Sequence, residues 1–212
     1  MNIKQTRSNT GSYVSGHCNS TNFKMTENLK IVLKNFADFD QQELDQIVRY
    51  FKPKSIKKNS ILLHEANVCK EFYYIYTGCI RTFFIDKNGY EKTRYIILDN
   101  QIGTTLTSFI SQKPSFEFVD TLDDTELLTI NHQDFYNLNK EINSWKILYQ
   151  KILERAYSFQ NRRIEALVTL SAKQRYEQLL KKSPLLIQRV SNKVLASYLD
   201  MREETLSRLK TK

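Results

Sequence analysis

The 212-residue sequence lacks the features that anchor or export a protein. No apolar run approaches the roughly 20 residues of a membrane span. The polar first 24 residues also lack the apolar centre of a secretory signal. We therefore expect a soluble protein with a cytoplasmic localisation and no membrane partner.

Cysteine and histidine are too scarce to build a metal or disulfide site. The sequence holds three cysteines without a C-x-x-C pair, which argues against a disulfide framework and against structural zinc. Its three histidines are dispersed, and no H-x-H cluster of the kind used by cupin-like enzymes occurs. The sequence therefore predicts no catalytic residues, no metal site and no cofactor.

Residues 55–130 have the composition of a β domain. They are rich in Ile, Tyr, Phe and Thr and hold only three glycines. Turns are predicted at Gly78 and at residues 86–89, and two short helices at 29–36 and 44–51 precede the region. The predicted strands are residues 72–77, 79–85, 90–98, 118–122 and 126–130. Their order predicts an antiparallel β-roll or jelly roll of about eight strands within an α+β fold.

The net charge of +9 is confined to the last third of the chain. Residues 140–212 hold 16 Lys and Arg against 7 Asp and Glu, whereas residues 1–139 hold 16 of each sign. Basic residues commonly do no more than solvate helix faces. Beside the helix pattern described next, however, a neutral first part and a basic last part indicate a sensing domain joined to a domain that binds a polyanion.

The last 21 residues have the apolar spacing of a helix-turn-helix. Glu204, Ser207 and Arg208 lie at i, i+3 and i+4, so they share one polar face of the second helix. This is the face that a recognition helix presents to the major groove. The apolar contacts between the two helices are predicted at Leu195, Ala196, Leu199, Met201, Leu206 and Leu209.

One long helix of about 25 residues is predicted to connect the two parts. Its apolar stripe can pack either on the protein's own β domain or on the same helix of a second subunit. We favour a homodimer, because helix-turn-helix proteins usually read two half-sites as two-fold dimers. The residues assigned to the dimer contact are Trp145, Leu148, Ile152, Ala156 and Phe159.

The order of β-roll, long helix and terminal helix-turn-helix resembles the Crp/Fnr family of bacterial transcription regulators over most of residues 29–212. The most specific likeness is the segment E-T-L-S-R at residues 204–208, which is similar to the family's E-T-L/V-x-R recognition signature. Gly78 and the Asn88-Gly89 turn also match the family's β-roll. The resemblance implies a leader predicted to be disordered (1–24), a cyclic-nucleotide-binding-like sensor domain (25–140), a dimerisation helix (141–170) and a helix-turn-helix DNA-binding domain (171–212).

The helix-turn-helix departs from the family pattern in three ways. Asp200 stands where the family usually has glycine, which is tolerable because Asp can adopt the left-handed conformation. Arg202 replaces the usual Ser or Thr cap, so a less firm start of the second helix is expected. The sequence ends directly after the recognition helix, so we expect a domain that lacks most of the β-hairpin wing.

The resemblance implies double-stranded DNA as a partner and RNA polymerase as a further candidate partner. We expect Arg208 to read a guanine and Glu204 a cytosine at a shared base step. The alternative is that the two side chains only form an exposed ion pair with each other. The full set assigned to DNA is Arg202, Glu203, Glu204, Thr205, Ser207, Arg208 and Lys210.

The β-roll of this family also implies a small-molecule effector. Members that bind cyclic AMP hold its ribose with a Gly-Glu pair and its phosphate with an Arg-Ser/Thr-Ala run, whereas here Thr104 follows Gly103 and residues 115–118 read S-F-E-F. Because this segment has Glu117 and no arginine, we expect an unknown effector rather than cyclic AMP. An iron-sulfur centre would need four cysteines. The effector-pocket candidates are Gly103, Thr104, Thr105, Ser115, Phe116 and Phe118.

These features together predict a sequence-specific DNA-binding transcription regulator of the Crp/Fnr type. The alternative is a ligand-binding or protein-interaction module whose helix-turn-helix no longer reads DNA. We do not expect enzymatic activity, because the clustered histidines and carboxylates of a cupin-like metal site are missing.

Overall fold

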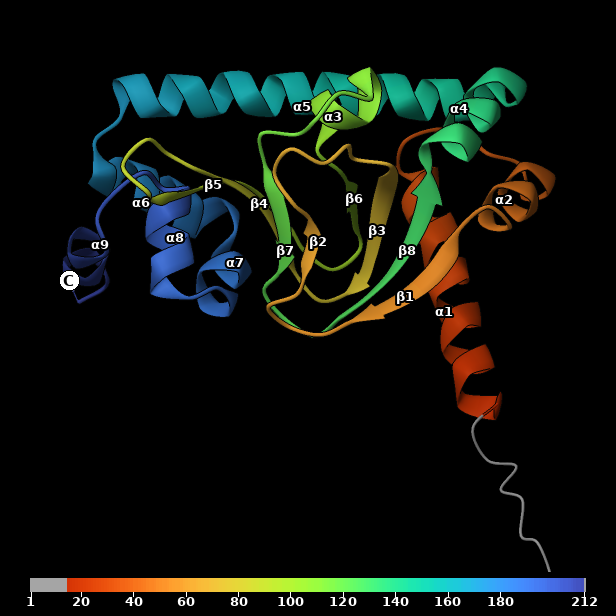
Figure 1. The fold of residues 1–212 in the computed structure, drawn as a ribbon, viewed down its shortest axis with the longest axis horizontal. Helices are drawn as coiled ribbons and strands as arrows, with labels where there is room; N and C mark the ends of the chain where they lie inside the picture. The colour runs from red at the N-terminus through yellow and green to blue at the C-terminus, as the bar shows by residue number, and fades with distance from the viewer. Residues whose placement is uncertain (1–14, 212) are drawn as a thin grey trace, which may run out of the picture.

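The structure is a computed structural model that describes residues 15–211, with side chains from residue 20 onward. A β-roll lies between N-terminal and C-terminal groups of helices, and one long helix runs past all three (Figure 1). The elements in chain order are α1 (Ser15–Lys34), α2 (Gln41–Val48), β1 (Lys52–Ile56), β2 (Ile61–Leu63), β3 (Glu71–Thr77), β4 (Ile80–Ile85), β5 (Glu91–Ile97), β6 (Gln101–Gly103), α3 (Leu106–Ser111), β7 (Phe118–Thr121), β8 (Thr125–Asn131), α4 (His132–Glu141), α5 (Asn143–Thr169), α6 (Ala172–Lys182), α7 (Pro184–Arg189), α8 (Asn192–Tyr198) and α9 (Glu203–Lys210).

Helix α1 corrects the prediction of a disordered leader. The helix begins at Ser15, so residues 15–24 are helical, whereas residues 1–14 lie outside the described part of the chain. Met25 and Leu29 are buried where α1 contacts β3 and β8. This tertiary packing stabilises a helix whose first ten residues carry no apolar pattern of their own.

Two antiparallel four-stranded sheets form the predicted β-roll. Their strand orders are β1-β8-β3-β6 and β2-β7-β4-β5. Strand β3 pairs with both β6 and β8, and β4 pairs with both β5 and β7. Alternate side chains of each strand point between the sheets, where they build the main apolar core. The predicted α+β class with a β-roll is confirmed.

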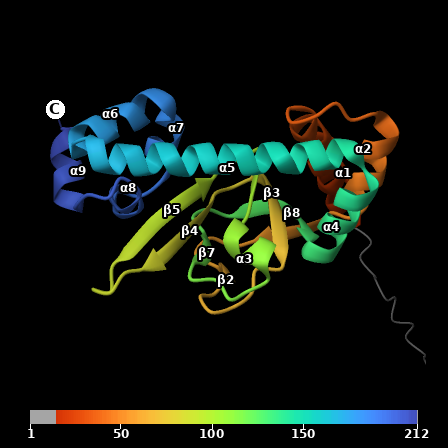
Figure 2. The same cartoon turned by 90° about the horizontal axis from the view of Figure 1, so that it is seen from above.

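Two turns fix the central strands. Gly78 joins β3 to β4 with φ +119°, and a Cβ atom there would lie 2.4 Å from Oγ1 of Thr125, so only glycine fits. At the tip of the β4–β5 hairpin, the Asp86 carboxylate accepts hydrogen bonds from the N–H groups of Asn88 and Tyr90. The hairpin therefore holds its register as it extends toward the C-terminal helices (Figure 2).

Helix α5 lies over the roll and buries one apolar face on it (Figure 2). Trp145, Leu148 and Ile152 are 1%, 1% and 8% exposed, and all three belong to the main core. The indole N–H of Trp145 donates a 3.1 Å hydrogen bond to the carbonyl oxygen of Phe135 in α4. The prediction that these three residues contact a second subunit is therefore wrong. Helical periodicity identified a buried face, but it could not tell which surface covers that face.

Helices α6 to α9 share a second apolar core with the roll. This cluster joins Cys79 and Ile96 of the roll to buried residues of the C-terminal helices, including Leu186, Leu195 and Leu206. Burial raises the pKa of the Cys79 thiol to about 12, so this cysteine is a packed, protonated side chain. The C-terminal helices are thus docked on β4 and β5 beside the end of α5 (Figures 1 and 2).

Candidate DNA interface and effector pocket

Helices α8 and α9 form the predicted helix-turn-helix. The Ser191 hydroxyl caps α8 by accepting from the N–H of Val194, and Asp200 occupies the turn with φ +50°. Arg202 precedes α9 without a side-chain capping hydrogen bond, as the sequence indicated. Leu206 of α9 is fully buried against the second core.

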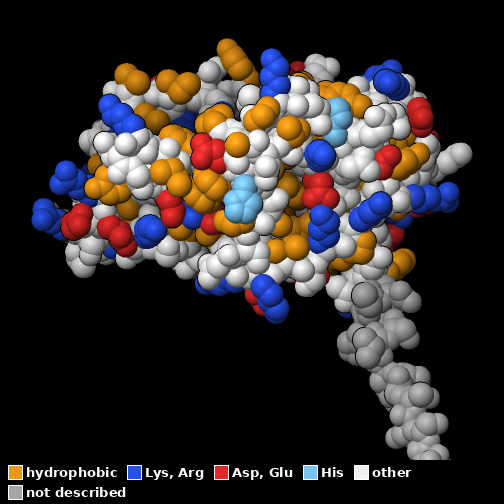
Figure 3. Space-filling model, in the orientation of Figure 1, with side chains coloured by type: hydrophobic (Ala, Val, Ile, Leu, Met, Phe, Trp, Pro, Cys, Tyr) orange, Lys and Arg blue, Asp and Glu red, His pale blue; other side chains and the backbone are white. Residues whose placement is uncertain are grey.

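The polar face of α9 points away from the protein. Six of the seven residues assigned to DNA are exposed, and Thr205 is half-buried. No ion pair joins Glu204 to Arg208 among the described residues, so both side chains remain available. Lys210 is the one that has a side-chain partner, the Asn192 amide oxygen at 2.6 Å. Lys and Arg side chains project at this end of the molecule (Figure 3).

The helix-turn-helix is attached to the β4–β5 hairpin through polar contacts. The Ser197 hydroxyl accepts from the N–H of Thr93 at 2.7 Å and donates to the carbonyl oxygen of Glu91 at 2.8 Å. Lys92 pairs with Asp200 in the turn at 2.7 Å. These contacts place the turn of the helix-turn-helix directly beside β5.

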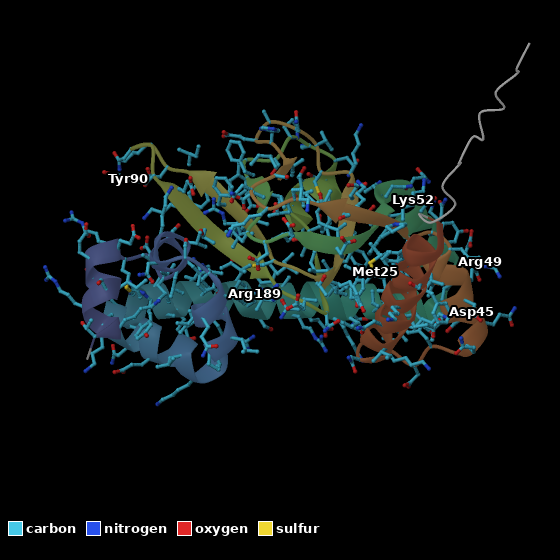
Figure 4. The ribbon with its side chains drawn as sticks, turned by 90° about the horizontal axis from the view of Figure 1, so that it is seen from below. Met25, Asp45, Arg49, Lys52, Tyr90 and Arg189 are labelled. Carbon is cyan, nitrogen blue, oxygen red and sulfur yellow. The ribbon has the colours of Figure 1, made fainter. Side chains whose placement is uncertain are left out.

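Two ion pairs attach α7 to the opposite ends of the same sheet. The guanidinium of Arg189 pairs with Asp99 and with Asp123, which follow β5 and β7. Figure 4 labels Arg189 where the C-terminal helices meet the strands. Hydrogen bonds from both carboxylates raise the pKa of Arg189, so it stays charged. The orientation of the C-terminal helices is therefore set by charges on both structural parts.

A cavity of about 540 Å³ lies between the roll and α5. We call it the roll pocket. Its volume is in the usual range for small-molecule sites. Gly103, Thr104 and Thr105 line it, as predicted from the sequence. The Thr105 hydroxyl is buried and has no hydrogen-bond partner in the described part of the chain, so a polar group is left for a ligand.

The other predicted pocket residues do not reach the roll pocket. Ser115 is buried against the backbone of Glu117, Phe116 is about half exposed, and Phe118 stacks on Phe83 with ring centroids 5.1 Å apart. Glu117 lines the pocket instead. The reason is the alternation of side chains as the chain enters β7, which turns residue 117 inward and its neighbours outward.

Glu117 forms a buried ion pair with Arg94 inside the roll pocket. The Arg94 guanidinium lies 3.1 Å from the Glu117 carboxylate, and the Glu117 side chain is only 5% exposed. Burial raises the pKa of Glu117, and the nearby Arg94 opposes this shift. An anionic ligand at Arg94 would therefore have to displace or face a carboxylate.

Arg155 is a pocket residue that sequence reasoning missed. It comes from α5, and its guanidinium lies 4.0 Å from the ring centroid of Phe36 in the segment after α1. No carboxylate pairs with it among the described residues. Only the tertiary structure brings this arginine, about 50 residues beyond the β-roll segment, to the same cavity.

A second apolar face of α5 remains uncovered. Leu153, Tyr157, Ile164 and Leu167, with Gln160 between them, follow the alternating four- and three-residue spacing of a coiled-coil seam. Tyr157 is 71% exposed and Ile164 is 59% exposed. Hydrophobic side chains are visible along the edge of the molecule formed by α5 (Figure 3). Of the residues first assigned to a dimer, Ala156 and Phe159 are half-buried and line the roll pocket.

Searches for a membrane span and a metal cluster were both negative in the described part of the chain. No helix within residues 15–211 is long and apolar enough to cross a membrane. No three His, Cys, Asp or Glu side chains gather there to hold a metal ion.

Residues 53–141 match the family model of the cyclic nucleotide-binding domain. No curated protein sequence matches the chain. Among solved structures, catabolite activator protein from Thermus thermophilus is 20% identical, with a TM-score of 0.56 and 85% of each chain covered. The c-di-GMP responsive regulator CLP from Xanthomonas campestris is 16% identical, with a TM-score of 0.65, covering 81% of this chain and 90% of that one.

A structure of a CooA mutant from Carboxydothermus hydrogenoformans is similar as well. It is 18% identical, with a TM-score of 0.63, and the match covers 78% of this chain and 77% of that chain. At such identities the likeness defines the fold. The class of protein is therefore a β-roll of the cyclic nucleotide-binding type joined through one long helix to a helix-turn-helix. This is the fold of the Crp/Fnr transcription regulators, so the predicted resemblance is confirmed.

Proposed function

We propose that the protein is a sequence-specific DNA-binding transcription regulator of the Crp/Fnr type. The observation that carries this proposal is the exposed polar face of α9, where Glu204, Ser207 and Arg208 project into solvent without an intramolecular partner for their side chains. The helix behind this face is fixed by the burial of Leu206. A rigid helix with a free polar face is what major-groove reading requires.

We propose a homodimer that forms through the second apolar face of α5. Leu153, Tyr157, Ile164 and Leu167 lie on that face, opposite the side that packs on the roll. A two-fold pairing of this seam would cover apolar side chains that are otherwise wet. It would also place two copies of α9 to read two half-sites.

The roll pocket is the proposed effector site, and its effector is not cyclic AMP. The Arg94 guanidinium is already neutralised by Glu117, and the segment that would hold a cyclic phosphate supplies no other cation. A phosphate buried without such a partner loses its charge-assisted hydrogen bonds. The Thr105 hydroxyl and Arg155 remain as polar groups for a different ligand.

Selection of bound fragments from a random pool of DNA duplexes tests the proposal directly. A specific regulator should enrich a two-fold symmetric sequence and retain it against excess non-specific DNA. A protein-interaction module that has lost DNA reading should enrich no sequence, and any residual binding should disappear as salt is raised. The second result would contradict the proposed function.

A further inference from the structure

A second cavity, distinct from the roll pocket, lies where the long helix meets the C-terminal helices. It has a volume of about 470 Å³ and lies between α5, α6 and α8. We call it the hinge cavity. Four of its lining residues are cations: Arg162 and Arg163 from α5, and Arg175 and Lys182 from α6. No Asp or Glu occurs among its lining residues in the described part of the chain.

The two half-buried arginines of the hinge cavity have only neutral partners. Arg163 donates to the carbonyl oxygens of Thr93 and Tyr198, at 3.0 and 2.8 Å. Arg175 donates to the carbonyl oxygens of Leu170, Leu199 and Asp200. These bonds fix both guanidinium groups in place but leave their positive charges uncompensated.

Other partly or fully buried arginines of this protein are neutralised. Arg81 pairs with Asp120 and Glu91, Arg94 with Glu117, and Arg189 with two aspartates. In contrast, Arg162 and Lys182 at the hinge cavity make no hydrogen bond or ion pair to any described residue. Four positive charges around one cavity repel one another, and an anion bound among them would remove that repulsion.

We propose that the hinge cavity binds a phosphorylated small molecule that carries at least two negative charges. Guanidinium groups match phosphate oxygens in geometry, and lysine adds a mobile charge. The cavity volume suits a small ligand, whereas a DNA duplex is far too wide to enter it. A bound phosphate would bridge α5 to α6 and thereby hold the helix-turn-helix in one orientation. This site is independent of whether α9 reads DNA.

Calorimetric titration of the full chain with sodium tripolyphosphate at low ionic strength tests the proposal. The test protein carries Arg162→Ala and Lys182→Ala, since neither side chain supports the fold through a recorded contact. The control carries Lys151→Ala and Lys181→Ala, which remove the same charge from exposed positions on the same two helices outside the cavity lining. Circular dichroism should show unchanged helix content in both, and Arg162→Gln with Lys182→Gln replaces the test pair if the alanine variant is less stable.

The wild type and the control are expected to bind tripolyphosphate and to melt at a higher temperature with it. The test variant should bind at least about tenfold more weakly, the factor expected from losing one charge-assisted hydrogen bond. Equal binding by test and control would show general surface attraction and overturn the proposal. Absence of wild-type binding, together with weaker DNA binding and a flatter salt dependence of the test variant, would also overturn it, because the cations would then serve DNA phosphates.

Discussion

The backbone N–H of Thr93 in β5 donates a 2.7 Å hydrogen bond to the hydroxyl of Ser197 in α8. The next two residues of β5, Arg94 and Tyr95, line the roll pocket, and the Tyr95 ring lies 5.0 Å from the ring centroid of Phe159 in α5. One strand therefore contacts both the proposed effector site and the helix-turn-helix. A ligand that displaces Arg94 acts on the same strand that holds α8.

Replacement of Ser197 by alanine should weaken the docking of the C-terminal helices. The N–H of Thr93 would lose its acceptor in a partly buried position, which typically costs about 1 to 3 kcal/mol. Urea denaturation should report a free energy of unfolding lower by that amount. Ser207→Ala is the matched control, since its side chain is exposed and has no recorded hydrogen bond. A loss equal to the control would show that this contact does not stabilise the docked arrangement.

Two isoleucines of α5 should respond oppositely to a charge. Ile164→Glu puts two carboxylates into the proposed seam, so sedimentation should report a monomer with unchanged helix content. Ile152→Glu places a carboxylate in the protein's own core and should lower the free energy of unfolding by several kcal/mol instead. A dimer that persists in Ile164→Glu would show that the subunits meet elsewhere.

Arg208 should read a base, whereas Lys210 should contact phosphate. Arg208→Ala is expected to cost about 1 to 3 kcal/mol per half-site and to relax the preference at one symmetric base pair. Lys210→Ala should weaken specific and random DNA alike and reduce the salt dependence. Both effects can be measured by fluorescence anisotropy across a salt series. If Arg208→Ala weakens both kinds of DNA equally, the arginine contacts phosphate and the base-reading assignment fails.

Glu117 should give the protein a component of stability that falls as pH rises. Burial raises the pKa of Glu117 above its ordinary value of 4.5, so the folded state holds this proton more tightly than the unfolded state. The free energy of unfolding should therefore decline from about pH 4.5 upward, through the raised pKa. Glu117→Gln cannot titrate, and the difference in stability between the two proteins should change over that window. A pH-independent difference would contradict the assignment.

Cyclic AMP should not bind the roll pocket in the micromolar range. Its phosphate would meet Glu117 beside Arg94, and a charge-assisted hydrogen bond lost in this way is typically worth about 1.5 to 3 kcal/mol. Calorimetric titration of the wild type should show no saturable heat. Micromolar binding would show that Arg94 exchanges Glu117 for the ligand.

The sequence by itself determined the elements whose cause is local. Alternating apolar residues predicted the central strands, and helical spacing predicted α6 at residues 172–182 with its observed bounds. The left-handed conformation of Asp200 and the uncapped start of α9 at Arg202 also followed from residue type, because backbone preference and capping depend on neighbours in the chain. Gly103 to Thr105 could be placed in a pocket because they belong to one short segment.

Only the tertiary structure decided which surfaces meet. A helix with two apolar faces does not reveal which one its own domain covers, so the stripe from Trp145 to Ile152 was assigned to a partner although the roll buries it. Arg155 and the four cations of the hinge cavity come from helices far along the chain from the β-roll. Their proximity depends on the path of α5 over the roll and on the docking of α8 on β5, and those packing contacts leave no local pattern in the sequence.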